Sequence, residues 1–291
     1  GRLMKKRPAR GEGAARPRDG CRATVRLHGA ATPGAGEMPC SDLPRALELA
    51  VGDGLACDAL EFAVQTMLRG ERAAVTCSEA AWLRDAGLPA ALGLEDPPAR
   101  LVIDITLESF DEPPEWRHLG EEEKLCSAAA RKEVGATLVR QKRWALALRC
   151  YKRIAEMVGY VEGFSGARRG RALELRRLAE LNAALCCLRM EDWAAARRAC
   201  DYVLKADPES VKALFRRGCA LNSLGEHGAA VADLRRCLEL EPGDDAVRKA
   251  LQQAQRGLRT EGEASRGVFA RMCAAPRGRE EAGQGGETPA A

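Results

Sequence analysis

The chain has 291 residues, enough for two domains that each bury a core. Its 46 basic and 42 acidic side chains leave a net charge of +4, so the overall charge favours neither nucleic acid nor an anionic membrane as a partner. No apolar run approaches the ~20 residues that span a bilayer, and the N-terminus lacks the apolar stretch of a secretory signal. The 12 cysteines show no metal-ligand spacing and are typical of core residues in a reducing compartment. We therefore expect a cytoplasmic, or also nuclear, protein.

The first 112 residues predict an antiparallel sheet with one short helix. Alternating apolar residues, the pattern of a half-buried strand, occur in four segments: 22–28, 47–51, 73–77 and 101–107. Between the second and third segments, apolar residues at helical spacing predict a helix from Asp58 to Leu68 that stops before Gly70. One helix against such a sheet makes an α+β domain.

The order of these elements resembles that of the FKBP family of prolyl isomerases over roughly residues 1 to 112. The similarity rests on the helix that runs into VQTMLRGERAAVTCS and on a last strand, ARLVIDITLESFD, after a proline-bearing loop. The resemblance implies a pocket floored by aromatic side chains that desolvates a twisted proline amide. A tyrosine hydroxyl and an aspartate lie near the substrate carbonyl in that family.

The matching positions of this chain are mostly aliphatic. The pocket tryptophan of the family falls on Leu60, the tyrosine of a later loop on or beside Leu83, and the phenylalanine of the last strand on Ile103. The phenylalanine–aspartate pair falls near Met38, and Trp82 remains as the aromatic residue near the later loop. Aliphatic side chains supply neither the hydroxyl nor the carboxylate nor a flat wall. We therefore expect a degenerate FKBP-like domain with weak or no isomerase activity.

The segments outside the two domains are polar. Residues 1–20 carry seven basic and two acidic side chains without interleaved aromatics, so a solvated lead-in is expected rather than a nucleic-acid site. Residues 113–120 read as a proline-bearing linker, and 276–291 lack apolar residues and should be disordered. The start at Gly1 suggests a fragment, in which case an active FKBP domain can precede Gly1 in the parent protein.

Residues 121–258 contain an internal repeat. Three residue pairs share an offset of 34: Pro208 and Pro242, Ala196 and Ala230, Trp193 and His227. A further copy lies 49 residues upstream, and its extra residues fall around 159–170, where the loop GFSGARRG can sit. This is the tetratricopeptide (TPR) pattern, which predicts three helical pairs, a capping helix over roughly 245–258 and a concave groove. A short helix over 267–273 should follow the array.

The tryptophans of the repeats and the histidines of the chain are interpreted as residues without a catalytic or metal-binding role. Trp144 and Trp193 stand at equivalent repeat positions and are typical of core residues between helices. His28, His118 and His227 match no metal or triad spacing. We therefore predict no catalytic residue, no metal and no cofactor.

The first helix of each repeat should line the groove with cations and an amide. The groove-facing positions carry Lys132 in the first repeat, Asn182 in the second, and Lys212 and Arg216 in the third. Lys212 and Arg216 are four residues apart and share one helical face. This set resembles the two-carboxylate clamp of TPR domains that hold the C-terminal tail of heat shock protein 90 or 70. The fifth clamp position, an asparagine in that family, is Ala136 here.

The combination of the two parts resembles the second FKBP domain and the TPR domain of the large steroid-receptor immunophilins. The segments LNAALCCL, VKALFRRG and GVFARMC support the similarity. It implies a co-chaperone whose groove binds a chaperone tail while the front domain spaces or contacts a client, such as a steroid receptor complex. Two alternatives stay open: an active prolyl isomerase targeted by its TPR domain, and a TPR scaffold for a non-chaperone partner. Calmodulin binding by 247–258 also stays open.

Overall fold

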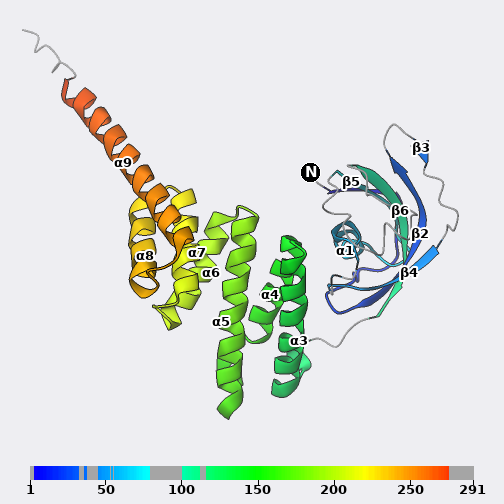
Figure 1. Ribbon diagram of the computed structural model, residues 1–291. Coiled ribbons are helices and arrows are strands. Elements are labelled where there is room, and N and C mark those ends of the chain that lie inside the picture. The colour runs from blue at the N-terminus through cyan, green and yellow to red at the C-terminus, as the bar shows by residue number, and fades with distance from the viewer. Residues whose placement is uncertain are drawn as a thin grey trace, which may run out of the picture.

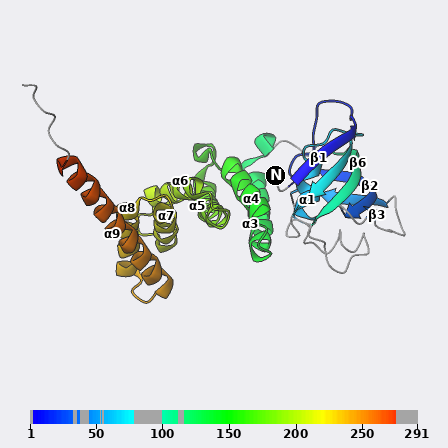
Figure 2. The ribbon, with the colours of Figure 1, turned by 90° about the horizontal axis from the view of Figure 1, so that it is seen from above.

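The computed structural model describes residues 3–32, 36–37, 45–52, 54, 56–78, 100–111 and 116–274. A sheet with one short helix forms one end of the molecule, and a row of helices leads away from it (Figure 1). Seen after a 90° turn, the helical pairs stack one after another toward α9 (Figure 2). The predicted fold class, an antiparallel α+β domain followed by an all-helical array, is confirmed.

The sheet is antiparallel throughout, with strand order β1-β5-β6-β2-β3 and β4 also paired with β2. Its strands are β1 (Leu3–Ala9), β2 (Arg22–Thr32), β3 (Gly36–Glu37), β4 (Arg45–Ala50), β5 (Arg72–Cys77) and β6 (Leu101–Phe110). The four alternating segments lie in β2, β4, β5 and β6, as predicted. Their inward residues, such as Val25 and Ile105, are fully buried because alternate side chains of a strand point to one face.

Strand β1 corrects the expectation of a solvated lead-in. Its residues pair with β5, with Leu3 opposite Cys77. Lys5 forms a 2.8 Å ion pair with Glu71, whose side chain is 1% exposed. The sequence did not predict this strand because it has basic side chains in place of an alternating apolar pattern. The strand is held by its hydrogen bonds to β5, which is distant in the sequence.

Helix α1 (Asp58–Val64) packs against the sheet and is shorter than the predicted 58–68. After it, the Thr66 hydroxyl donates to the carbonyl of Ala63, and Gly70 has a φ of +72°. A hydroxyl that bonds to the local backbone competes with the helical hydrogen bonds, which explains the early end.

The helical array contains three antiparallel pairs and a last helix. Its members are α3 (Glu121–Arg140), α4 (Trp144–Met157), α5 (Gly166–Arg189), α6 (Trp193–Ala206), α7 (Val211–Ser223), α8 (His227–Leu240) and α9 (Asp245–Ala274). Two short 3-10 helices, η2 (Trp116–His118) and η3 (Val161–Gly163), precede α3 and α5. A Cβ added at Gly218 would lie 2.7 Å from Leu234 Cγ, so the small residue lets α7 and α8 approach closely.

Two expected boundaries in the array differ from the observed ones. The segment GFSGARRG was expected as a loop, but residues 166–170 form the start of α5. The capping helix continues beyond 258 to Ala274 as one helix and includes the expected short helix over 267–273. Two glycines lie in its second half, but the next proline is Pro276, so nothing in the sequence blocks the helical hydrogen bonds before that point. Among the described residues, no helix is both long and apolar enough to cross a membrane.

Arg143, in the turn between α3 and α4, joins the two domains. Its guanidinium is buried, lies 2.5 Å from the Asp58 carboxylate and donates to the carbonyls of Gly54 and Ala56. Beside it, the Cys150 thiol donates to the carbonyl of Gly52 at 3.6 Å. Separating a buried guanidinium from a charged partner and two carbonyl acceptors costs free energy, because buried polar groups would lose their hydrogen bonds. These contacts hold the front domain against the first repeat.

Candidate functional site

The first helices of the three repeats, α3, α5 and α7, are neighbours in the array and carry the four predicted binding residues. Lys132 lies on α3, Asn182 on α5, and Lys212 and Arg216 on α7. The side chain of Lys212 is exposed, whereas those of the other three are half-buried. The stacking of the repeats thus brings residues that are 84 positions apart, from 132 to 216, onto adjacent helices.

A hollow between α5 and α7 contains Lys212 and Arg216. Its volume is about 410 Å³, which is in the range of pockets that hold small ligands or a few side chains. The residues that line it are Leu185, Leu188, Arg189, Trp193, Lys212, Phe215, Arg216, Cys219 and Ser223. Three cations therefore lie beside a mainly apolar wall, an arrangement that suits a negatively charged group attached to an apolar side chain.

Arg216 is held in place by a backbone contact. Its Nη1 donates to the carbonyl of Leu181 at 2.5 Å, which orients the guanidinium. Burial lowers the pKa of Arg216 from its ordinary value, although an arginine remains charged at neutral pH. A cation in such a partly desolvated place attracts an anion more strongly than one in bulk water, because the local dielectric is lower.

Lys132 and Asn182 are not among the residues that line this hollow. The Lys132 ammonium lies 3.1 Å from Glu133, whose side chain is 73% exposed. An exposed pair of this kind contributes little, about 0 to 1 kcal/mol, so a ligand carboxylate can replace Glu133. Lys132 and Asn182 lie on α3 and α5, outside the lining of this hollow.

Sequence reasoning missed Arg189, Leu185 and the exposed part of Trp193. Arg189 and Leu185 follow Asn182 by seven and three residues, so helical spacing alone places all three on one face of α5. Trp193 was interpreted as a core residue, but it is half-buried and lines the hollow. The period of the repeat marks Trp193 as equivalent to Trp144 but does not show which side of the indole faces outward.

The predicted degenerate isomerase positions that the structure describes lie in the front core. Leu60 on α1 is 1% exposed and Ile103 on β6 is 0% exposed. Leu83, Trp82 and Met38 lie outside the described residues. His28 on β2 has its Nε2 2.8 Å from the Thr106 hydroxyl, a contact between neighbouring strands. Among the described residues, no group of three or more His, Cys, Asp or Glu could hold a metal ion.

Comparisons with known proteins agree with this architecture. A family model for the tetratricopeptide repeat matches residues 181–255. Peptidyl-prolyl cis-trans isomerase FKBP4 of Mus musculus is 30% identical over 279 residues, which cover 94% of this chain and 58% of that protein. The Homo sapiens protein is 29% identical over the same shares. The chain thus spans less than two thirds of the length of these relatives.

One solved structure supports the fold of the helical array, and a second one is reported for its sequence similarity. The C-terminal TPR-containing domain of a Plasmodium falciparum putative FK506-binding protein, PFL2275c, is 23% identical with a TM-score of 0.50, and covers 51% of this chain and 99% of that chain. The first TPR of Spaghetti (RPAP3), bound to the HSP90 peptide SRMEEVD, is 23% identical with a TM-score of 0.38, and covers 49% of this chain and 98% of that chain. Over 94% of its length the chain is therefore similar to FKBP4, and part of its helical array matches the tetratricopeptide repeat.

Proposed function

We propose that the protein is a co-chaperone that binds the acidic C-terminal tail of heat shock protein 90 or 70 in its TPR groove. The observation that carries this proposal is the hollow between α5 and α7, where Lys212, Arg216 and Arg189 lie beside an apolar wall. A peptide whose last residue is an aspartate, preceded by an aliphatic residue, offers two carboxylates and one apolar side chain. That chemistry complements this hollow.

The expected affinity follows from the number of charged contacts. A hydrogen bond to a charged group contributes about 1.5 to 3 kcal/mol, and part of that sum is lost to the ordering of the peptide. In this proposal Lys212 and Arg216 bind one carboxylate of the peptide, and Lys132 and Asn182, on α3 and α5, bind the second carboxylate. A micromolar complex, about 8 kcal/mol, is the expected result.

The front domain serves as a spacer or client contact in this proposal, without prolyl isomerase activity. Leu60 and Ile103 support this part because both are buried in the apolar core. A substrate amide would find neither a flat aromatic wall nor a hydroxyl at these two positions. Robust turnover of a proline peptide by the purified chain would contradict this part of the proposal and favour an isomerase targeted by its TPR domain.

The test is a titration of the full chain with a labelled SRMEEVD peptide and with the same peptide as its C-terminal amide. The clamp requires the free carboxylate, so the amide should bind at least tenfold more weakly. The double variant Lys212→Ala/Arg216→Ala should lose binding of the free acid to a similar degree. The matched control is Arg198→Ala/Arg235→Ala, which removes two exposed arginines on α6 and α8.

A TPR scaffold for a partner without a C-terminal carboxylate is the second candidate. Ala136 favours it, since an alanine at the fifth clamp position removes one amide contact to the peptide. Equal binding of the acid and the amide, or no binding of either, would support the scaffold and refute the carboxylate clamp.

A further inference from the structure

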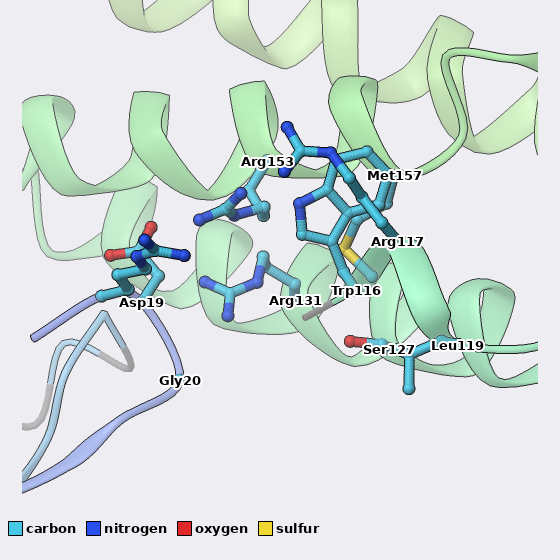
Figure 3. A pocket seen from close by; sticks show the side chains of 10 residues that line it. Asp19, Gly20, Trp116, Arg117, Leu119, Ser127, Arg131, Arg153 and Met157 are labelled. Carbon is cyan, nitrogen blue, oxygen red and sulfur yellow. The ribbon is translucent and has the colours of Figure 1, made fainter. Parts of the chain in front are cut away.

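A second hollow lies at the boundary between the two domains, outside the TPR groove. Figure 3 shows it between the segment that carries Asp19 and Gly20 and the helices of the first repeat. Residues from η2, α3 and α4 complete it: Trp116, Ser127, Arg131, Arg153 and Met157. Its volume is about 250 Å³. Pockets for whole drug-sized ligands hold about 300 to 1,000 Å³, so this one suits a single charged group with a small body attached.

The hollow carries an excess of positive charge. Four arginines line it, Arg131, Arg153, Arg18 and Arg117, whereas Asp19 is the single acidic side chain among the described lining residues. The Oδ1 atom of Asp19 accepts from Arg149 at 2.6 Å and from Gln65 at 2.9 Å. Because Arg149 already neutralises this carboxylate, Asp19 does not cancel the charge of the arginines that face the hollow.

Arg131 and Arg153 point into this space from α3 and α4, toward the segment of Asp19 and Gly20 (Figure 3). Arg153 forms a 3.0 Å pair with Glu156, whose side chain is 57% exposed, so the pair is a weak surface contact that an anion can displace. Arg131 contacts the Cys150 thiol, and burial raises the pKa of that thiol to about 11. The thiol is therefore neutral at pH 7 and does not balance the charge of Arg131.

The opposite side of the hollow is apolar. The indole of Trp116 and the buried side chain of Met157 form this wall, and the Arg117 guanidinium lies 5.1 Å from the centre of the Trp116 ring. A flat or short apolar body can lie against the indole while its charged end reaches Arg131 and Arg153. The shape thus separates a charge-binding side from a side that holds the body of the ligand.

We propose that this interdomain hollow binds a phosphate monoester attached to an aromatic ring or a short apolar chain. A phosphate presents three acceptor oxygens and close to two negative charges, and guanidinium forks match such oxygens in pairs. A single carboxylate would leave part of this charge unbalanced. The phosphate can belong to a free monoester or to a phosphorylated side chain of another protein, and the two sources share the chemistry that the hollow recognises.

Both domains contribute to the site, so its occupation should also stabilise their arrangement. Arg131 and Arg153 belong to the first repeat, whereas Asp19 and Gly20 belong to the front domain. The buried contacts of Arg143 already hold the domains together, so the site is present before the ligand arrives. A ligand that binds only the joined domains raises the free energy of their separation.

The experiment is isothermal titration calorimetry of the full chain with phenyl phosphate, inorganic phosphate and a capped Gly-phosphotyrosine-Gly peptide. We expect saturable 1:1 binding of phenyl phosphate and binding of inorganic phosphate at least fivefold weaker, because it lacks the ring. Peptide binding as tight as that of phenyl phosphate would identify a phosphorylated protein as the source, and weaker peptide binding would identify a free monoester. Absence of saturable binding in all three titrations would overturn the proposal.

Three variants locate the site. Arg131→Ala should weaken phenyl phosphate binding at least tenfold, and Ser127→Glu, which places a carboxylate in the hollow, should abolish it. The groove variant Lys212→Ala/Arg216→Ala should bind phenyl phosphate like the wild type. Loss of binding in the groove variant, or unchanged binding in both hollow variants, would refute this location. Circular dichroism checks that each variant is folded. If Arg131→Ala does not fold, the binding of phenyl phosphate by Ser127→Glu tests the location of the site.

Discussion

The buried contacts of Arg143 make a quantitative prediction about stability. The side chains of Arg143 and Asp58 are 5% and 10% exposed, so both charges are largely removed from water and their ion pair offsets part of that cost. Arg143→Met removes the hydrogen bonds that Arg143 donates to Asp58 and to the carbonyls of Gly54 and Ala56. Removal of one partner of a buried pair costs about 3 to 5 kcal/mol. We therefore expect Arg143→Met to lower the free energy of unfolding by about that amount.

A double-variant cycle separates this pair from a general loss of packing. Asp58→Asn alone removes the charge that is hydrogen-bonded to buried Arg143, whereas Arg143→Met/Asp58→Asn removes both charges of the pair. The loss in the double variant should be smaller than the sum of the single losses by about 1 to 3 kcal/mol. Urea unfolding followed by circular dichroism measures all four free energies.

The matched control is an exposed arginine in an ion pair. Arg236 lies close to Glu209 with side-chain exposures of 45% and 63%, so Arg236→Met should lower the free energy of unfolding far less than Arg143→Met does. If Arg143→Met costs no more than this control, or if the two single losses simply add, the buried pair does not join the domains in the way described here.

Three further predictions concern single positions. Burial is the largest cause that raises the pKa of Glu61 from 4.5 to about 7. The folded state therefore binds an extra proton between these values, so stability should fall as the pH rises from 4.5 to about 7 and then level off. Between pH 5 and pH 8, the free energy of unfolding measured with urea should decrease less for Glu61→Gln than for the wild type. Equal decreases would refute the role of Glu61 in this pH dependence. Gly218→Ala places a Cβ 2.7 Å from Leu234 Cγ and should destabilise by about 1 to 3 kcal/mol, whereas Gly228→Ala on α8 meets nothing within 4 Å and should not lower the melting temperature. Ala136→Asn restores the fifth clamp position, so the affinity for SRMEEVD should rise by about tenfold, about 1.4 kcal/mol, and an unchanged affinity would argue against the clamp.

The front sheet shows where local sequence is sufficient and where it is not. Strands β2 and β6 follow from their alternating apolar residues, because that alternation is the direct signature of a face turned to the core. Strand β1 did not follow, since its lysines and proline mask a segment that is ordered by β5. Helix α1 was predicted in place but too long, because Thr66 ends it through a contact that helical periodicity does not encode.

The candidate site divides in the same way. Lys212 and Arg216 were predicted together because a spacing of four residues sets one helical face. Trp193 was missed, although it lines the same hollow, because its position depends on how α6 lies against α7, whereas the helical spacing from Asn182 could have indicated Arg189. A repeat period predicts which helices stack but not which side chains meet between them.

The sequence by itself determined the domain order, the repeat and the charges of the groove, because these follow from periodicity and spacing within single elements. Only the tertiary structure decided how the two domains meet. Arg143 and Asp58 are 85 residues apart, and so are not connected by any local pattern. Asp19, which lines the interdomain hollow, and its partner Arg149 are 130 residues apart. Contacts of this kind depend on the packing of whole domains, which no window of the sequence contains.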